Sequence, residues 1–278
     1  MEIRTLFHYT SLDTLALILT NRTLCFNNLC HVDDIEEAET SDMANFGKYV
    51  YVSCWTSDPH ESIALWGLYT SNMHGVRIEL PCYPFKKHVY HKGQYYFNER
   101  VETYINMDKL YDDNKASIVA NQPELVKVEY TDDEKMIIPQ IRSFNGQGSI
   151  DLYLNAKNIS EVGNFGVMYS FDNLGKYKRK VWEFQNEWRY TISVMPMGLK
   201  EMYPQSFKKH QEIIRRIENP NTPSPYERFF LELDENAISQ MRVVFGPRMS
   251  EAEKIFAKLL LKEHGLQNNY RESALKIR

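Results

Sequence analysis

The spacing of apolar residues alternates along this chain between the two-residue period of a strand and the longer period of a helix, and this constrains the fold most. Residues 3–9, IRTLFHY, alternate as a strand does, and Leu15, Ile18 and Leu19 then share one helical face. The same patterns predict further strands at 23–28, 47–55, 74–81, 125–130, 187–194, 229–234 and 241–247, and helices at 59–72 and 250–266. We therefore expect one α+β domain over residues 1–278.

Residues that favour helix ends stand where the periodic patterns change. The stretch TSLD matches a capping box, so Thr10 and Ser11 are expected to start the first helix. Pro59 suits the first turn of the second helix. Ser250 and Gly265 suit the two ends of the last helix.

Residues 83–180 carry weaker patterns. We interpret them as a helical insertion with at least one strand and with a short helix broken by Pro139. The acidic segment 31–42 is expected to be a solvated turn leading into a helix, and residues 273–278 a short closing strand. The chain contains no internal repeat and no linker-like run, which favours a single domain.

Composition narrows the class of protein. The net charge of −4 gives no overall basic field, and no apolar run approaches the roughly 18 residues of a membrane helix, so a cytoplasmic chain is expected. The N-terminus has no apolar signal region. Four cysteines are scattered without a CxxC pair, which fits reduced thiols. His88 and His91 form one isolated HxxH, and because a zinc site needs about four ligands, no metal is expected.

Polar and aromatic residues gather where two predicted strands end. His8, Tyr9 and Thr10 end the first strand, and Ser53 and Trp55 end the strand at 47–55. A neutral imidazole can bind a ribose hydroxyl through one nitrogen while the protein holds the other. The alternative is a packed histidine under the first helix. Ser53 could bind a ligand or a carboxylate, although serine is common at strand ends.

A third polar group lies on the predicted strand that begins near Gln185. In a strand, Gln185, Glu187 and Arg189 point to one face. This arrangement gives either a surface ion pair or a carboxylate held beside an amide in a cleft. Four basic residues precede the strand, among them Lys178 and Lys180, and they form either a solvated turn or a phosphate contact.

These motifs occur in a recognisable order. HYT, SCW, WGLY followed by HG, and KRKVWEFQNEWRY together resemble a widespread bacterial family of uncharacterised proteins, over nearly the whole chain. That family's pattern in turn resembles the ADP-ribosyltransferase superfamily. Three motifs mark this superfamily: a histidine or arginine on the first strand, a serine-containing strand and a [QE]xE pair. The resemblance implies a split, mixed or antiparallel sheet with flanking helices.

The resemblance also implies roles for single residues. Gln185 and Glu187 would be the catalytic pair, and glutamine at 185 resembles transferases that modify nucleobases or side chains other than arginine. Residues 33–37, DDIEE, depart from the family's NDPxE segment, which leaves the role of this loop open. Residues expected to contact NAD or a phosphate are His8, Tyr9, Thr10, Ser53, Trp55, Tyr69, Arg189, Lys178 and Lys180.

The implied activity is transfer of ADP-ribose from NAD, used as a substrate, to a protein or nucleic acid. Such a chain would be a toxin or anti-phage effector, with an antitoxin or chaperone as a candidate partner and no membrane. Glu187 would stabilise the oxocarbenium-like centre formed when nicotinamide leaves. No GxGxxG precedes a helix, so a Rossmann site is not predicted. The alternatives are a non-catalytic module that binds a nucleotide or a partner, and an NAD glycohydrolase.

Overall fold

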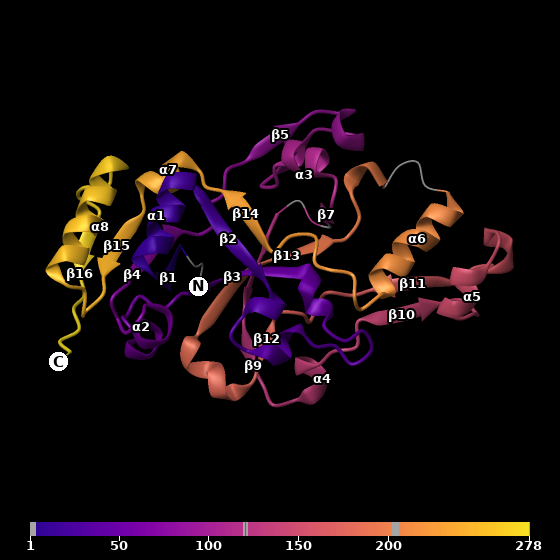
Figure 1. The fold of residues 1–278 in the computed structure, drawn as a ribbon, viewed down its shortest axis with the longest axis horizontal. Coiled ribbons are helices and arrows are strands. Elements are labelled where there is room, and N and C mark those ends of the chain that lie inside the picture. The colour runs from indigo at the N-terminus through magenta and orange to yellow at the C-terminus, as the bar shows by residue number, and fades with distance from the viewer. Residues whose placement is uncertain (1–3, 119, 121, 202–205, 278) are drawn as a thin grey trace.

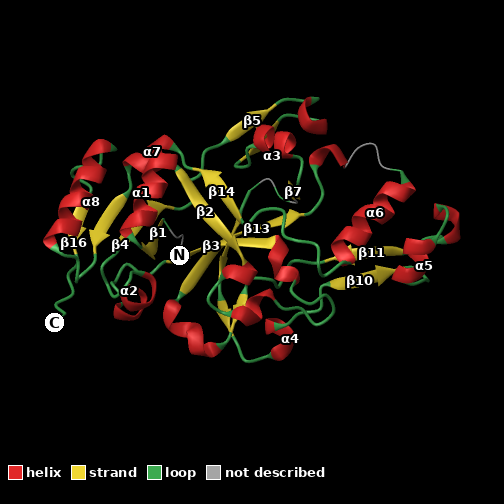
Figure 2. Ribbon diagram, viewed as in Figure 1, coloured by secondary structure: helices red, strands yellow, loops and turns green. Residues whose placement is uncertain are grey.

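A computed structural model describes residues 4–118, 120, 122–201 and 206–277. A mixed, mostly antiparallel sheet runs through the molecule in the order β14-β2-β3-β1-β4-β15-β16 (Figures 1 and 2). The parallel pair in this order is β15 with β16. The strands on this path are β1 Thr5–Thr10, β2 Thr23–Asn28, β3 Val50–Thr56, β4 Val76–Pro81, β14 Arg228–Glu232, β15 Arg242–Phe245 and β16 Tyr270–Glu272.

The sheet forks at β3. One edge of β3 pairs along its length with β13 Glu187–Met195. The other edge is shared between two strands. β1 pairs with it through Phe7↔Thr56, and β2 pairs with it through Asn27↔Val52 and Asn28↔Tyr51. The half formed by β1, β4, β15 and β16 therefore diverges from the half formed by β2 and β14, and α1 connects them.

Helices cover the two ends of the molecule. In Figure 1, α1, α2, α7 and α8 gather around β1, β4 and β15, whereas α5 and α6 lie beside β10 and β11 at the opposite end. Ser11 caps α1, and Ser250 caps α8 in a capping box with Glu253. The helices are α1 Leu12–Asn21, α2 Ile63–Tyr69, α3 Met107–Asp113, α4 Glu134–Ile137, α5 Ile150–Asn155, α6 Phe207–Glu218, α7 Glu235–Ser239 and α8 Glu251–Glu263.

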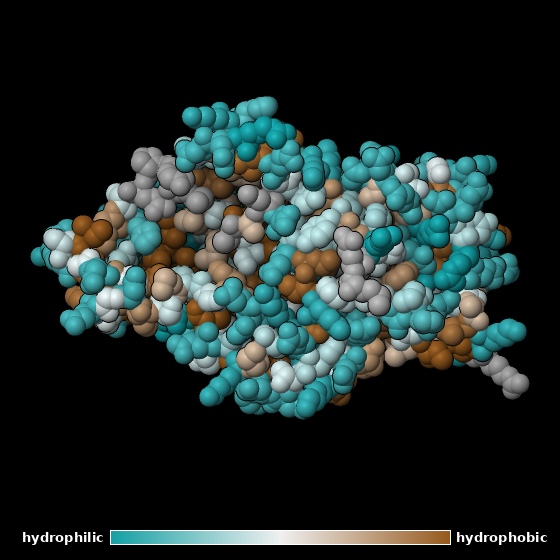
Figure 3. All heavy atoms as spheres, turned by 180° about the vertical axis from the view of Figure 1, so that it is seen from behind, coloured by the Kyte–Doolittle hydropathy of each residue, from teal (hydrophilic) through white to brown (hydrophobic). Residues whose placement is uncertain are grey.

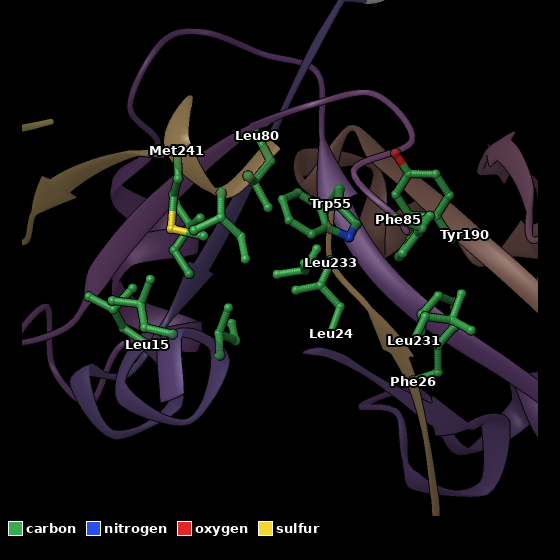
Figure 4. Packing of buried hydrophobic residues seen from close by; sticks show 14 of the residues in the cluster. Leu15, Leu24, Phe26, Trp55, Leu80, Phe85, Tyr190, Leu231, Leu233 and Met241 are labelled. Atoms are coloured by element: carbon green, nitrogen blue, oxygen red, sulfur yellow. The ribbon is translucent and has the colours of Figure 1, made fainter. Parts of the chain in front are cut away.

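The main core lies between α1 and the sheet. Figure 4 shows Trp55 between Leu15 and Leu80 on one side and Phe85 on the other. Trp55 is only 3% exposed, so most of its indole belongs to this core. Burial of such large side chains contributes on the order of 2 kcal/mol each and stabilises the fork from one side.

The predicted mixed sheet with flanking helices is confirmed, but several local predictions are wrong. α2 begins at Ile63 with Ser62 as its cap, so Pro59 lies before the helix. The closing strand is Tyr270–Glu272; of the strand predicted at 273–278, residues 273–277 form no strand and residue 278 lies outside the described residues. α4 does end before Pro139, as expected.

Residues 83–180 contain short strands interspersed with the helices α3, α4 and α5, and so have less helix than expected. β8 extends the sheet at β13, and β7 pairs with the end of β13. The predicted strand at 125–130 is divided at Val128 into β8 and β9. The strands of this segment are β5 His88–Tyr90, β6 Val101–Thr103, β7 Ser117–Ile118, β8 Glu124–Lys127, β9 Glu129–Tyr130, β10 Arg142–Asn145, β11 Gly166–Tyr169 and β12 Tyr177–Lys178.

Hydrophilic residues cover much of the face shown in Figure 3, with smaller hydrophobic areas between them. Among the helices of the described residues, none combines the length and the apolar character needed to cross a bilayer.

Candidate functional site

A cavity of about 570 Å³ lies at the fork and is lined by β1, α1, β2 and β3. Its volume is within the roughly 300–1,000 Å³ typical of small-molecule sites. The side chain of Lys180 lies outside it, 63% exposed and 3.5 Å from Asp132. The predicted site residues that line the cavity are His8, Tyr9, Thr10, Ser53, Trp55, Tyr69, Lys178, Gln185, Glu187 and Arg189.

Glu187 and Arg189 form a buried bidentate pair at the start of β13. Arg189 Nε donates to Glu187 Oε1 at 2.5 Å, and Arg189 Nη2 donates to Oε2 at 3.1 Å. Lys178 Nζ also donates to Oε2, at 3.1 Å. The predicted common face of Glu187 and Arg189 is confirmed. A surface ion pair is wrong, because Glu187 is 5% exposed and Arg189 is fully buried.

A second carboxylate completes this charge cluster. Arg189 donates to both oxygens of Glu37, and Lys178 Nζ lies 3.3 Å from Glu37 Oε1. Glu37 belongs to the 3₁₀-helix η2, Ile35–Ala38, and is buried. The prediction that segment 31–42 is a solvated turn is therefore wrong at Glu37. Two buried carboxylates face two buried cations, and this balance allows all four charges to leave water.

Gln185 reaches the same cluster by a different route from the one predicted. It ends the 3₁₀-helix η6, Lys180–Gln185, and Asn186 has a left-handed φ of 42° before β13 begins. Gln185 and Glu187 are therefore not on one strand, yet the turn places both beside Lys178. Lys178 Nζ donates to Gln185 Oε1 at 2.8 Å, and Gln185 Nε2 donates to the Tyr69 hydroxyl at 2.5 Å.

Tyr69 is fixed from two sides. Besides accepting from Gln185, its hydroxyl donates to Asp33, and burial together with the charge of Asp33 raises the pKa of Tyr69. The phenol stays protonated at neutral pH and serves as a neutral hydrogen-bonding group in the cavity wall.

His8 is held in one tautomer. Its Nδ1 donates to the Cys54 carbonyl at 2.8 Å, since a carbonyl only accepts. Burial lowers the pKa of His8 more than this hydrogen bond raises it, so the ring is neutral and its Nε2 is an acceptor. The centroid of the imidazole ring lies 5.1 Å from the centroid of the Trp55 ring. Trp55 Nε1 in turn donates to Ser53 Oγ at 3.0 Å, so these two polar groups already contact each other.

Tyr9 and Thr10 connect the cavity to the helices. The Tyr9 hydroxyl accepts from the backbone N–H of Ser62 at 3.0 Å, and its ring packs edge-on against Trp66. Thr10 is the last residue of β1, and Ser11 alone caps α1.

Among the residues that sequence reasoning did not select for this site are Asp33, Glu37 and Cys54. Asp33 and Cys54 line the cavity, and Glu37 neutralises Arg189. Burial and the neighbouring Glu187 raise the pKa of the Cys54 thiol, so it is protonated. The charge complementarity of DDIEE and KYKRK was the signal in the sequence that could have linked Glu37 to Lys178.

Acid should weaken the fold through Glu187. Burial alone would raise its pKa, but Arg189 and Lys178 outweigh burial and lower it from 4.5 to about 2. Because the folded-state pKa is depressed, this group stabilises the protein above pH 4.5 and loses that contribution as the pH falls towards 2. The loss amounts to about 3 kcal/mol.

Urea unfolding of the wild type and Glu187→Gln between pH 2 and pH 4.5 would measure this loss of stability. We expect the difference in unfolding free energy between the two proteins to shrink by about that amount on acidification. A difference that does not change with pH would contradict the burial of an ionised Glu187.

Within the described residues, no group of three or more histidine, cysteine, aspartate or glutamate side chains is placed to hold a metal ion. Comparison with models of known protein families, with curated proteins and with solved structures finds no match for this chain.

Proposed function

We propose that this chain is an ADP-ribosyltransferase-like protein that binds NAD in the cavity at the fork and transfers ADP-ribose to a macromolecule. The observation that supports the proposal is that three motifs far apart in the sequence, represented by His8, Ser53 and the Gln185–Glu187 pair, line one cavity.

The proposed chemistry uses groups already in suitable protonation states. The bond between nicotinamide and the ribose breaks, its electron pair leaves with nicotinamide, and an oxocarbenium-like centre develops. Ionised Glu187 would accept a hydrogen bond from the ribose 2-hydroxyl and oppose the positive charge. Neutral His8 would accept another ribose hydroxyl through Nε2. An acceptor group then forms the new bond to the ribose and loses its proton.

Glu187 has limited capacity for this role. Its carboxylate already accepts three N–H groups from Arg189 and Lys178, and a carboxylate offers about four acceptor sites. The Cys54 thiol donates to the same carboxylate and fills the remaining site, so a ribose hydroxyl would have to displace it. The two cations also reduce the negative charge that a developing cation would experience, and this favours a non-catalytic nucleotide-binding module as the second candidate.

One experiment separates these candidates. The protein is incubated with NAD labelled in the adenosine half, together with separate pools of protein, DNA and RNA, while nicotinamide release is measured. Label in one pool supports the transferase and identifies the acceptor. Release without labelling indicates an NAD glycohydrolase. Calorimetric binding without release indicates the binding module, and absence of both contradicts the proposal.

A toxin or anti-phage role, with an antitoxin or chaperone as partner, remains part of the proposal. It predicts that expression arrests growth and that Glu187→Gln relieves the arrest. Equal toxicity of the two proteins would count against an enzymatic toxin.

A further inference from the structure

One face of the sheet continues the cavity from β13 to β14. Directly paired residues of antiparallel strands lie on the same face, and this face repeats every second residue. The register pairs Arg189 with Cys54 and Asn27 with Val52, and Arg228 with Asn27. One face of the sheet therefore carries a row of side chains that all line the cavity, namely Glu187, Arg189, Cys54, Val52, Asn27 and Arg228.

The cations on this face differ in what they contact. Lys178 and Arg189 are buried and paired with Glu37 and Glu187. Arg228 is exposed on β14 and lines the cavity, and it forms no ion pair with any residue that the structure describes. Its guanidinium therefore has five donors available for an anion, and its fork matches phosphate geometry.

An aromatic ring lies beside this cation. Phe230 is two residues further along β14, so it faces the same side as Arg228, and it lines the cavity while 45% exposed. An exposed aromatic face in a cavity wall is suited to stacking on a planar base.

The distance between Glu187 on β13 and Arg228 on β14 sets the length of a ligand that could contact both. β13, β3, β2 and β14 are successive neighbours, and strands lie about 4.8 Å apart, so β14 lies roughly 14 Å from β13 across the sheet. A ligand that contacts both Glu187 and Arg228 must be elongated.

We propose that Arg228 and Phe230 form a subsite for the adenosine diphosphate half of an elongated nucleotide, with Arg228 binding the phosphates and Phe230 stacking on the base. The subsite extends the cavity of the proposed function. It requires binding of adenosine diphosphate compounds but not cleavage of NAD.

The test compares ADP-ribose with adenosine, which lacks phosphate, by calorimetry and NMR titration. Arg228→Gln should weaken ADP-ribose binding about tenfold or more and leave adenosine binding unchanged, because a charge-assisted contact is lost. Phe230→Ala should weaken both ligands about tenfold. Matched controls are Arg242→Gln, an exposed strand arginine outside the cavity wall, and Phe256→Ala on α8, 66% exposed.

The outcomes distinguish this subsite from the proposed activity. If wild type binds NAD without releasing nicotinamide and Arg228→Gln weakens that binding, the subsite stands and the transferase fails. If nicotinamide is released and the KM for NAD in this reaction is the same for Arg228→Gln and Arg242→Gln, the transferase stands and the subsite is overturned. Failure of the wild type to bind ADP-ribose at millimolar concentration also overturns the subsite.

Discussion

Arg189→Met should destabilise the protein by about 3–5 kcal/mol, a large part of the total stability of a typical domain. Arg189 is fully buried and donates to both Glu37 and Glu187. Methionine matches the unbranched arginine side chain as far as Nε but carries no charge, so Lys178 alone would face two buried carboxylates. Urea unfolding at pH 7 measures the loss.

Two comparisons identify the charge balance as the cause. Arg179 also binds a glutamate through two nitrogens, but near the surface, so Arg179→Met should destabilise the protein far less than Arg189→Met does. Combining Arg189→Met with Glu37→Gln leaves one buried carboxylate, Glu187, paired with one buried cation, Lys178, and so restores the charge balance. The double variant should therefore be more stable than the sum of the two single effects predicts. Additive effects would contradict a coupled cluster.

Glu187→Gln should reduce nicotinamide release about 100- to 1,000-fold while NAD still binds within a few-fold of the wild-type affinity. In the proposed reaction, a glutamine keeps the shape of the side chain but removes the negative charge that would oppose the oxocarbenium-like centre, and this loss would act mainly in the transition state. Alanine is unsuitable here, because it would leave a hole beside two buried cations. Single-turnover release and calorimetry measure the two effects.

Glu183→Gln is the matched control for this prediction. Glu183 lies four residues earlier on η6, is exposed, and is outside the cavity wall. It should release nicotinamide at the wild-type rate. Circular dichroism must show that Glu187→Gln is folded at the assay temperature, since its charge cluster is unbalanced. Wild-type release by the folded variant would remove Glu187 from the chemistry.

The sequence predicted those parts of the fold that local patterns determine. β1 and α1 follow from alternation, helical spacing and the Ser11 cap, and α8 follows from helical spacing between Ser250 and Gly265. The motif order also led to the residues that meet in the cavity. Glu187 is the first residue of β13, whereas Ser53 is the middle residue of β3 and does not end its strand as predicted.

Long-range charge pairing could not be read in the same way. An acidic run such as 33–37 is ordinarily solvated, and only the fold places Glu37 against Arg189, 152 residues later. Gln185 was placed on a strand because a two-residue spacing fits one, whereas the left-handed Asn186 produces the same proximity through a turn. The predicted strand at 229–234 included Phe230 but not Arg228, and the exposure of both residues depends on which strand ends the sheet.

The fork has a mechanical consequence. β1 and β4 share six residue pairs, but β3 holds β1 through one pair and β2 through two, so the seam between the halves is thinly bonded. A ligand in the cavity would contact β1 on one side of this seam and β2 on the other, and would link the two halves of the sheet. Binding should therefore slow backbone amide hydrogen exchange along β1 and β2, including at residues that the ligand does not contact.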